Sequence, residues 1–411
     1  MTPECRHCGS PLRTSFCDLG MSPLANSYVP MAEADRMEPF YPLHAYVCGT
    51  CFLVQLQDFE TAENIFSEDY AYYSSFSDSW VEHARRYVEM MIGRFGFDAN
   101  SQVIEIASND GYLLQFFKQA GVPCFGIEPA ANAARIAEET HGIPSITAFF
   151  GEALGKQLAG EGKQADLLLG NNVLAHVPDI NDFVRGLKLA LNPGGVITFE
   201  FPHLLKLIEF NQFDTIYHEH FSYLALGSVE TVFGAFGLKL FDVEEVPTHG
   251  GSLRIFATHA ENDALAETDR LAALRATEAA ARLTSLEAYT AYSAKVMATK
   301  RGLLKFLMEA KESGKSIVGY GAPAKGNTLL NYCGVGTDFI DYTVDRNPEK
   351  QNRLLPGTRI PIHAPERIAE TKPDYLLILP WNLKDEIAAQ MSQIRDWGGR
   401  FVTPIPEVEV F

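Results

Sequence analysis

The sequence predicts an α/β protein in which a small cysteine-rich module precedes two separate sets of alternating strands and helices. Four of the seven cysteines lie in two close pairs within the first 51 residues. Strand-like segments then alternate with helical ones from residue 103 to about residue 260, and the alternation returns beyond residue 316. Strands that are spaced by helices predict βαβ units, so we expect two domains that are each built on a mainly parallel sheet.

Composition and charge restrict the function. The chain has 411 residues, which suggests two or three domains, and 46% of them are hydrophobic. A formal net charge of -18 disfavours nucleic acid as a partner, because phosphate backbones attract Lys and Arg. No apolar run approaches the roughly 20 residues of a membrane span, and the N-terminus MTPECRHCGS lacks the features of a signal peptide. We therefore expect a cytoplasmic protein with no membrane partner, whose cysteines bind metal or stay reduced.

The strand and helix patterns set the expected domain boundaries. The first set contains the strands VIEIAS, CFGIEP, SITAFF, ADLLLGN and GVITFEF and the helices DSWVEHARRYVEMMIGRFG, YLLQFFKQAG, NAARIAEETHG and INDFVRGLKLALNPGG. The strands KLFDVEEVP and SLRIFATHA follow it and should pair antiparallel at one edge of the sheet, because only THGG separates them. The second set contains SIVGYGAP, KGNTLLNYCG, FIDYTVD, DYLLILPW, KDEIAAQMSQIRDWGG and RFVTPIP. We expect a module at residues 1–65, an α/β domain at 66–260, a connection of one or two helices at 261–300 and a second α/β domain at 301–411.

The N-terminal module carries a metal-binding pattern. Its residues show little periodicity, which suggests that a metal nucleates its fold. The candidate metal ligands are Cys5, Cys8, Cys48 and Cys51, in two Cys-x-x-Cys pairs that are each followed or interrupted by a glycine. Four thiolates suit tetrahedral zinc and leave no open coordination position, so we expect a structural zinc ion. A zinc ribbon that binds nucleic acid is the less favoured alternative because the chain is acidic, and Cys17 is expected to be a buried apolar side chain.

The first α/β domain carries a cofactor-binding pattern. The strand VIEIAS runs into Asn-Asp-Gly before a helix, and polar residues end the second and fourth strands of the same sheet. The candidate cofactor-binding residues are Glu105, Ser108, Asn109, Asp110, Gly111, Glu128, Pro129, Asn171 and Asn172. Glu128 is expected to accept hydrogen bonds from both hydroxyls of a ribose. The glycine-rich fingerprint of nicotinamide folds is absent here, and LNPGG precedes the fifth strand, so the pattern resembles class I methyltransferases that use S-adenosylmethionine (SAM).

A second group of residues points to acid–base chemistry. The segment YHEH carries Tyr217, His218, Glu219 and His220 just after the fifth strand, and His176 follows the fourth strand. Methyl transfer to carbon or to a hydroxyl requires that the acceptor lose a proton. Two histidines, a glutamate and a tyrosine at the ligand edge of a SAM fold therefore favour a catalytic role over a structural one.

Eight motifs together resemble a known family over essentially the whole chain. They are CRHCG…CGTC, LGMSPLANSY, EDYAYYSSFSDSW, IEIASNDG, NNVLAHV, YHEHFSYL, EVPTHGGSLRIF and GYGAPAKGNTLLN. Their order and spacing resemble the nucleotide-sugar C-methyltransferases, which modify deoxysugars. The resemblance implies an N-terminal zinc-binding domain, a SAM-binding middle domain and a Rossmann-like C-terminal domain that helps to bind the nucleotide sugar. It also implies methylation at C3 of an NDP-linked 4-keto-6-deoxyhexose, with TDP as the expected nucleotide.

The resemblance also implies roles for single residues. His220 matches the base that removes the C3 proton, with Tyr217 and Glu219 as partners that orient it or bind the sugar. His176 matches a residue that stabilises the developing oxyanion at C4. Tyr70 or Tyr72 is expected to line the sugar pocket.

The second α/β domain contains a turn that is open to two interpretations. Gly319, Gly321 and Ala324 follow a strand in a G-x-G-x-x-A arrangement, which is typical of a dinucleotide site and makes a dehydrogenase or epimerase the next enzyme class to consider. Pro323 and Lys325 depart from that fingerprint, whereas a turn that holds a diphosphate explains them. The candidate substrate-binding residues are Gly321, Lys325, Asn327, Asp345, Pro380, Trp381, His249 and Arg254.

Three other functions stay open at this point. A sugar O-methyltransferase would need no ketone in its acceptor, and a dehydrogenase or epimerase would need the C-terminal turn to bind a dinucleotide. A zinc-containing binding protein without activity would bind no SAM. The sequence is compatible with a monomer or a homo-oligomer.

Overall fold

The N-terminal part of the protein is a small antiparallel sheet. The computed structural model describes residues 2–59 and 73–411. The early elements are β1 (Thr14–Ser22), β2 (Val29–Pro30), η1 (Met31–Glu33), β3 (Tyr41–Val47) and β4 (Val54–Gln55). The sheet has the order β1-β3-β4-β10, and its last strand, β10 (Ser222–Tyr223), comes from the middle of the chain. The sequence shows little periodicity here, yet β3 buries alternate residues and β1 contacts helices that come much later in the sequence.

The central sheet has the order β11-β12-β9-β8-β5-β6-β7. Its strands are β5 (Val103–Ile106), β6 (Cys124–Ile127), β7 (Ser145–Ile146), β8 (Ala165–Asn171), β9 (Leu191–Pro202), β11 (Leu238–Val246) and β12 (Ser252–His259). The strands β5 to β9 pair in parallel, and β12 and β11 add an antiparallel pair at one edge, as the sequence predicts. The segment LNPGG is not a loop before the fifth strand. It already belongs to β9, because the helix before it ends at Ala190.

Helices cover both faces of the central sheet. The helices of this part of the chain are α2 (Asp78–Phe95), α3 (Leu114–Gln119), α4 (Ala131–Ile136), α5 (Glu152–Gly160), α6 (Ile180–Ala190), α7 (Leu204–Glu209) and α8 (Leu226–Ala235), with the short turns η2 (Ser74–Phe76), η3 (Ala137–His141), η4 (Leu174–His176), η5 (Phe213–Thr215) and η6 (Thr248–Gly250). Of these, α7 and η5 pack instead in the core shared with the N-terminal sheet and the C-terminal lobe. Alternate strand residues face opposite sides: Leu167 and Leu169 pack with α2 and α3, whereas Ile104 and Leu168 pack with α6 and α8. The sheet is therefore buried on both faces, as a parallel sheet requires.

The connection to the last domain consists of three helices rather than one or two. They are α9 (Asp269–Ala280), α10 (Leu286–Thr290) and α11 (Tyr292–Glu312). Helix α10 and the first turns of α11 lie against β1, where the rings of Phe16 and Tyr292 stack with their centroids 4.7 Å apart. This part of the chain therefore packs on the N-terminal sheet and continues into the C-terminal domain.

The C-terminal sheet has the order β16-β14-β13-β17-β18-β19. Its strands are β13 (Ile317–Tyr320), β14 (Thr343–Val344), β16 (Ile362–His363), β17 (Tyr375–Ile378), β18 (Arg400–Thr403) and β19 (Glu409–Val410), and its helices are α12 (Ala324–Cys333), α13 (Arg367–Thr371) and α14 (Lys384–Gln390), with the short turns η7 (Trp381–Leu383) and η8 (Ser392–Trp397). The strands pair in parallel except β19. A further strand, β15 (Arg353–Leu354), pairs with β2 of the N-terminal part.

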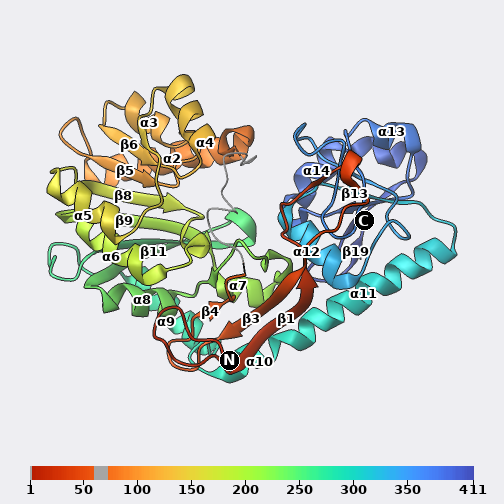
Figure 1. Cartoon of the computed structure of the whole chain (residues 1–411), viewed down its shortest axis with the longest axis horizontal. Coiled ribbons are helices and arrows are strands. Elements are labelled where there is room, and N and C mark those ends of the chain that lie inside the picture. Colours follow the sequence, from red (N-terminus) through yellow and green to blue (C-terminus); the bar gives the residue numbers. More distant parts are fainter. Residues whose placement is uncertain (1, 60–72) are drawn as a thin grey trace.

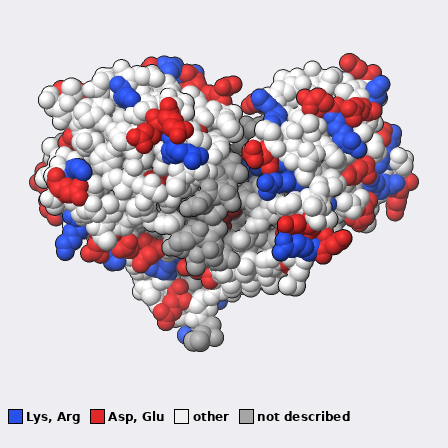
Figure 2. All heavy atoms as spheres, turned by 45° about the horizontal axis from the view of Figure 1, so that its top comes forward, with Lys and Arg blue, Asp and Glu red and all other residues white. Residues whose placement is uncertain are grey.

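The three parts contact one another closely. In Figure 1 the lobe with the central sheet and the C-terminal lobe stand side by side, and β1 and β3 lie below both. One core joins them, since it contains residues from every part, among them Phe16, Leu43, Phe213, Tyr292 and Leu329. On the face shown in Figure 2, acidic and basic side chains are interspersed over both lobes. Among residues 2–59 and 73–411, no helix is both long and apolar enough to cross a membrane.

Candidate active site

The four N-terminal cysteines form one cluster, as the sequence predicts. Their Sγ atoms all lie within 4.8 Å of one another, and the pairs Cys5–Cys51 and Cys8–Cys48 are each separated by 3.5 Å. Sulfur atoms about 2.3 Å from a tetrahedral zinc ion would be about 3.8 Å apart, which agrees with this spacing. Gln55 donates a hydrogen bond to Cys5 Sγ at 3.2 Å. Such a hydrogen bond from outside the coordination sphere supports a metal-bound thiolate. The cluster therefore fits a closed, structural zinc site. Cys17 is buried, and the pKa of its thiol is raised to about 12 by desolvation.

The turn after β5 has the tight backbone conformation that the cofactor-binding pattern predicts. Ala107, Asn109 and Gly111 all have positive φ angles, of 54°, 51° and 79°. At Gly111 a side chain would also meet Ala137, because a Cβ there would lie 3.1 Å from the Cβ of that residue. Glu128, at the end of β6, accepts hydrogen bonds from the backbone N–H groups of Asn109 and Ala130, both at 2.8 Å. Each of its oxygens retains a second lone pair for a ribose hydroxyl.

Buried acidic groups lie beneath this turn. Glu105 is 1% exposed, and neither of its carboxylate oxygens accepts a hydrogen bond from any described residue. Its pKa is raised well above the usual range by desolvation and by the nearby charges of Asp110 and Glu128. A ligand with a positive charge would compensate these acids, and SAM carries a sulfonium and an ammonium group. The turn, Glu128 and Glu105 therefore fit this cofactor.

The other predicted cofactor residues lie around the same turn. Ser108 is buried beside β6, since a Cβ at Gly126 would overlap its hydroxyl at 2.1 Å. Pro129 follows Glu128 and is half-buried. At the end of β8, the Asn171 side chain approaches the Tyr112 hydroxyl at 3.4 Å, and the Asn172 side chain approaches His249 Nε2 at 3.5 Å. The carboxyl ends of β5, β6 and β8 thus present polar groups at one edge of the sheet, as Rossmann-like folds do.

The predicted catalytic residues of YHEH and His176 come together. The ring centroids of His176 and His220 are 4.7 Å apart, and those of Tyr217 and His220 are 4.1 Å apart. His220 Nδ1 lies 2.9 Å from the carbonyl oxygen of Thr215, to which it can only donate, so Nε2 carries the lone pair of a neutral ring. His218 points elsewhere, to the carbonyl of Pro42.

Burial sets the ionisation of these side chains. The pKa of His220 is lowered well below its usual range by desolvation and by the neighbouring His176. Desolvation also lowers the pKa of His176 to about 4 and that of His249 to about 4. The pKa of Glu219 is raised to about 7 by desolvation, although a 2.7 Å hydrogen bond from Asn26 opposes the shift. At neutral pH the site therefore holds uncharged imidazoles that accept or donate protons. Tyr70 and Tyr72 lie outside the described residues.

The predicted residues of the C-terminal turn face this site from the other lobe. Lys325 donates to the Asn382 side chain at 2.6 Å and lies 4.7 Å from the centroid of the Trp381 ring. Trp381 Nε1 donates at 2.7 Å to Asp214, a buried residue of the central lobe. The pKa of Asp214 is raised to about 6 by desolvation, which the charge of Lys325 opposes. This chain of contacts joins the two lobes next to His249, because Gly250 packs against Trp381.

Several residues that were predicted to bind the substrate contact other parts of the protein. Asp345 accepts hydrogen bonds from the backbone of Ala322 at 2.7 Å and of Asn347 at 2.8 Å, so its carboxylate fixes the turn. Pro380 packs on Gly321, where a Cβ would lie 2.6 Å from Pro380 Cδ. Asn327 donates to the carbonyl of Ala25 at 2.7 Å. Asp345 thus fixes this turn in the way that Glu128 fixes the turn after β5.

Arg254 lies in a buried ion-pair network. Its guanidinium contacts Glu200 at 2.8 Å and Glu244 at 3.0 Å, and Glu200 in turn accepts a hydrogen bond from Thr248 at 2.7 Å. Thr248 precedes His249, whose φ angle of 54° is uncommon for a residue other than glycine. Arg254 therefore acts indirectly, through Glu200, on the turn that carries His249. This differs from the direct contact with the substrate that the sequence predicts for Arg254.

Sequence reasoning missed the residues where all three parts meet. Tyr28 donates to the carbonyl of Ala322, and Lys350 donates to the same oxygen at 3.0 Å while lying 5.0 Å from the Tyr28 ring centroid. Asn26, which holds Glu219, belongs to the same N-terminal segment. Asn26 and Tyr28 lie within LGMSPLANSY, a motif for which no role was derived, whereas nothing in the sequence singles out Lys350.

Comparison with known proteins agrees with this arrangement. Residues 5–66 match the model of a zinc binding domain, residues 80–243 that of a methyltransferase domain and residues 247–406 that of a C-methyltransferase C-terminal domain. The chain is 35% identical to C-methyltransferase NovU of Streptomyces niveus over 407 residues, which cover 99% of this chain and 96% of NovU. An ubiquinone biosynthesis O-methyltransferase of Azorhizobium caulinodans is 23% identical over 116 residues, which cover 26% of this chain and 46% of that protein.

Solved methyltransferase structures resemble part of the chain weakly. The 1,6-didemethyltoxoflavin-N1-methyltransferase of Burkholderia thailandensis covers 51% of this chain and 95% of its own, with 16% identity and a TM-score of 0.37, which is too low to support a conclusion. The full-length similarity to NovU and the three matching models are decisive instead. The chain belongs to the family of SAM-dependent C-methyltransferases that carry an N-terminal zinc-binding domain.

Proposed function

We propose that this enzyme transfers a methyl group from SAM to C3 of a TDP-linked 4-keto-6-deoxyhexose. The observation that carries the proposal is the state of His220, which is neutral, is held through Nδ1 by the carbonyl of Thr215 and lies against His176 and Tyr217. A neutral imidazole with one fixed nitrogen is a general base. Methylation at carbon needs such a base, because the acceptor carbon must first lose a proton.

Both the C4 ketone and His220 contribute to the first step, the removal of the C3 proton. A carbonyl at C4 acidifies the proton on C3, His220 Nε2 accepts that proton, and the electron pair of the C–H bond enters the enolate. The chemistry that SAM supplies when bound is an electrophilic methyl carbon, whose bond to sulfur breaks as its bond to C3 forms. The proton that His220 has accepted then leaves to solvent.

His176 stabilises the charge that develops on the C4 oxygen. Desolvation lowers its pKa to about 4, and its hydrogen bond to the backbone of Glu219 uses the single N–H of the neutral ring. Donation to the C4 oxygen from the other ring nitrogen therefore requires that His176 take up a proton as negative charge develops on that oxygen. Tyr217 and Glu219 are placed to orient the sugar or His220, since Tyr217 packs on the His220 ring and Glu219 is fixed by Asn26. Stabilisation of an oxyanion by preorganised donors is commonly the largest contribution to such a reaction.

The C-terminal turn binds the diphosphate of the nucleotide. Lys325 contacts Asn382 and Trp381 beside the site, and its charge contributes to the low pKa of His220. A bound diphosphate would neutralise that charge. The pKa of His220 would then rise, so that the base becomes stronger once the substrate is in place.

The test is to incubate the enzyme with methyl-labelled SAM and a panel of TDP- and GDP-linked 4-ketosugars. We expect a carbon-bound methyl group on C3 of a TDP-linked 4-keto-6-deoxyhexose, detected by mass spectrometry and NMR. The matched control is the same nucleotide sugar with a hydroxyl at C4, which should not react. Transfer to that control, or a methyl group on oxygen, would show an O-methyltransferase instead.

A further inference from the structure

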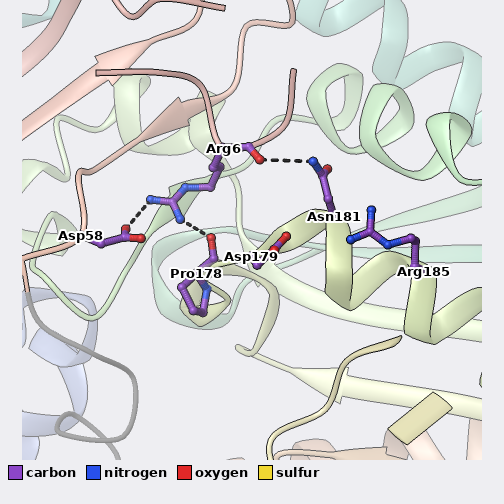
Figure 3. A pocket seen from close by; sticks show the side chains of 6 residues that line it. All are labelled: Arg6, Asp58, Pro178, Asp179, Asn181 and Arg185. Carbon is purple, nitrogen blue, oxygen red and sulfur yellow. Dashed lines mark hydrogen bonds and ion pairs between the residues drawn. The ribbon is translucent and has the colours of Figure 1, made fainter. Parts of the chain in front are cut away.

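The zinc-binding module contacts the catalytic lobe through the two residues between its first two ligands. Arg6 lies between Cys5 and Cys8, and its side chain is 9% exposed. Its guanidinium donates to the carbonyl of Pro178, which lies two residues after His176. In Figure 3 the Arg6 side chain extends from the N-terminal segment towards the loop that carries Pro178. One end of the zinc module thus holds the segment that carries His176.

The same guanidinium also contacts the segment that carries His220. It lies 5.4 Å from the centroid of the Phe221 ring, and Phe221 directly follows His220. It further donates to the carbonyl of Leu56 at 2.6 Å, while the Leu56 N–H donates to the carbonyl of Phe221 at 3.0 Å. Arg6 is therefore packed between the two catalytic segments and bound to both.

A second contact fixes the module on the same loop. His7 Nδ1 lies 2.8 Å from the side-chain oxygen of Asn181, and the Asn181 amide donates to the carbonyl of His7 at 2.9 Å. Asn181 belongs to the first turn of α6, which follows the His176 loop. The side chains of Arg6 and His7 therefore attach the peptide between Cys5 and Cys8 to the catalytic lobe.

We propose that Arg6 is a positioning residue that sets His176 relative to His220, and that zinc occupancy is coupled to the active site through it. The inference rests on the proposed function only for the roles of the two histidines. The ring centroids of the histidines are 4.7 Å apart, and a misplacement of about 1 Å in a catalytic group can lower a rate about 100-fold. A zinc ion bound by Cys5 and Cys8 would fix the backbone from which Arg6 reaches both segments.

The test compares Arg6→Ala with Arg185→Ala. Arg185 lines the same pocket of about 420 Å³ but pairs with Glu152, and it makes no hydrogen bond or ion pair with the described residues of the zinc module, so it serves as the control. We expect Arg6→Ala to lower kcat at least about 10-fold, with the KM for SAM nearly unchanged, and Arg185→Ala to have little effect. Because the pocket adjoins the removed side chain, added guanidinium ion should restore part of kcat in Arg6→Ala.

A second readout does not depend on the reaction. In the zinc-loaded protein without sugar, the imidazole NMR signals of His176 and His220 should shift in Arg6→Ala and stay in place in Arg185→Ala. Unchanged signals together with an unchanged kcat would overturn the proposal. Loss of zinc or of folded structure in Arg6→Ala, with no rescue by guanidinium, would assign Arg6 a purely structural role and overturn it as well. If the sugars tested are not substrates at all, the NMR result still decides.

Discussion

Two turns of the molecule share a construction and differ in charge. The turn after β5 is fixed by Glu128, which accepts a backbone hydrogen bond from Asn109 at 2.8 Å. The turn after β13 is fixed in the same way by Asp345, which accepts one from Ala322 at 2.7 Å. In both sheets the carboxylate stands at the end of the neighbouring parallel strand.

The ionisable side chains around the two turns are of opposite type, acidic at one and basic at the other. Beneath the first lie the buried acids Glu105 and Asp110, whereas Lys325 and Lys350 stand beside the second. One turn therefore suits a cation such as SAM, and the other suits a diphosphate. The difference teaches that the topology supplies a turn for a ligand, while the charges around it select which ligand binds.

The largest expected effect concerns the residue between the two turns. His220→Ala should lower kcat by roughly 10²- to 10⁴-fold, which is the usual contribution of a general base. Both turns remain intact, so the affinities for SAM and for TDP should not change. Steady-state kinetics and calorimetry measure the two quantities, and exchange of the C3 proton with solvent should cease. Full activity in this variant would remove His220 as the base.

The next effect isolates the second turn. Lys325→Met keeps the apolar stem and removes the charge, so the affinity for TDP should fall about 10- to 100-fold, as the loss of a charged hydrogen bond implies. The affinity for SAM should stay the same. Calorimetric titration with each ligand checks both statements, and an unchanged affinity for TDP would place the diphosphate elsewhere.

A smaller effect concerns the first turn and depends on pH. Burial raises the pKa of Glu105, so the free enzyme holds this acid protonated, and binding of a cation favours its ionised form. Binding then releases a proton, and the affinity for SAM should rise with pH by up to about tenfold per unit while the acid is protonated in the free enzyme. Glu105→Gln should flatten this slope in titrations at several pH values. An equal slope in both proteins would show that Glu105 does not sense the cofactor.

The smallest effect concerns the contact between the lobes. Trp381→Phe removes the hydrogen bond to Asp214 but keeps an aromatic ring over Lys325. The KM for the nucleotide sugar should rise about two- to tenfold, as expected for one hydrogen bond, with little change for SAM. A larger change in the KM for SAM than for the sugar would contradict the assignment of this contact to the second turn.

The sequence predicted local features well and distant contacts poorly. The strands of the central sheet, four of the six strands of the C-terminal sheet, the four cysteines and the meeting of His176 with YHEH all follow from short patterns and strand-end geometry. The edge strands β16 and β19 were not predicted. By contrast, β10 completes the N-terminal sheet, LNPGG lies inside β9, and Lys350 meets Tyr28 across more than 300 residues of sequence. Such contacts depend on how the domains pack, which no local pattern encodes. The domain boundaries, the cytoplasmic location and the residue roles stay predictions.

The most direct test of the account is a pair of calorimetric titrations, with SAM and with TDP, on the unchanged enzyme and on the Glu105→Gln and Lys325→Met variants. We predict that Lys325→Met weakens only TDP and that Glu105→Gln weakens only SAM. Loss of SAM affinity in Lys325→Met, or of TDP affinity in Glu105→Gln, would contradict the assignment of opposite ligands to the two turns.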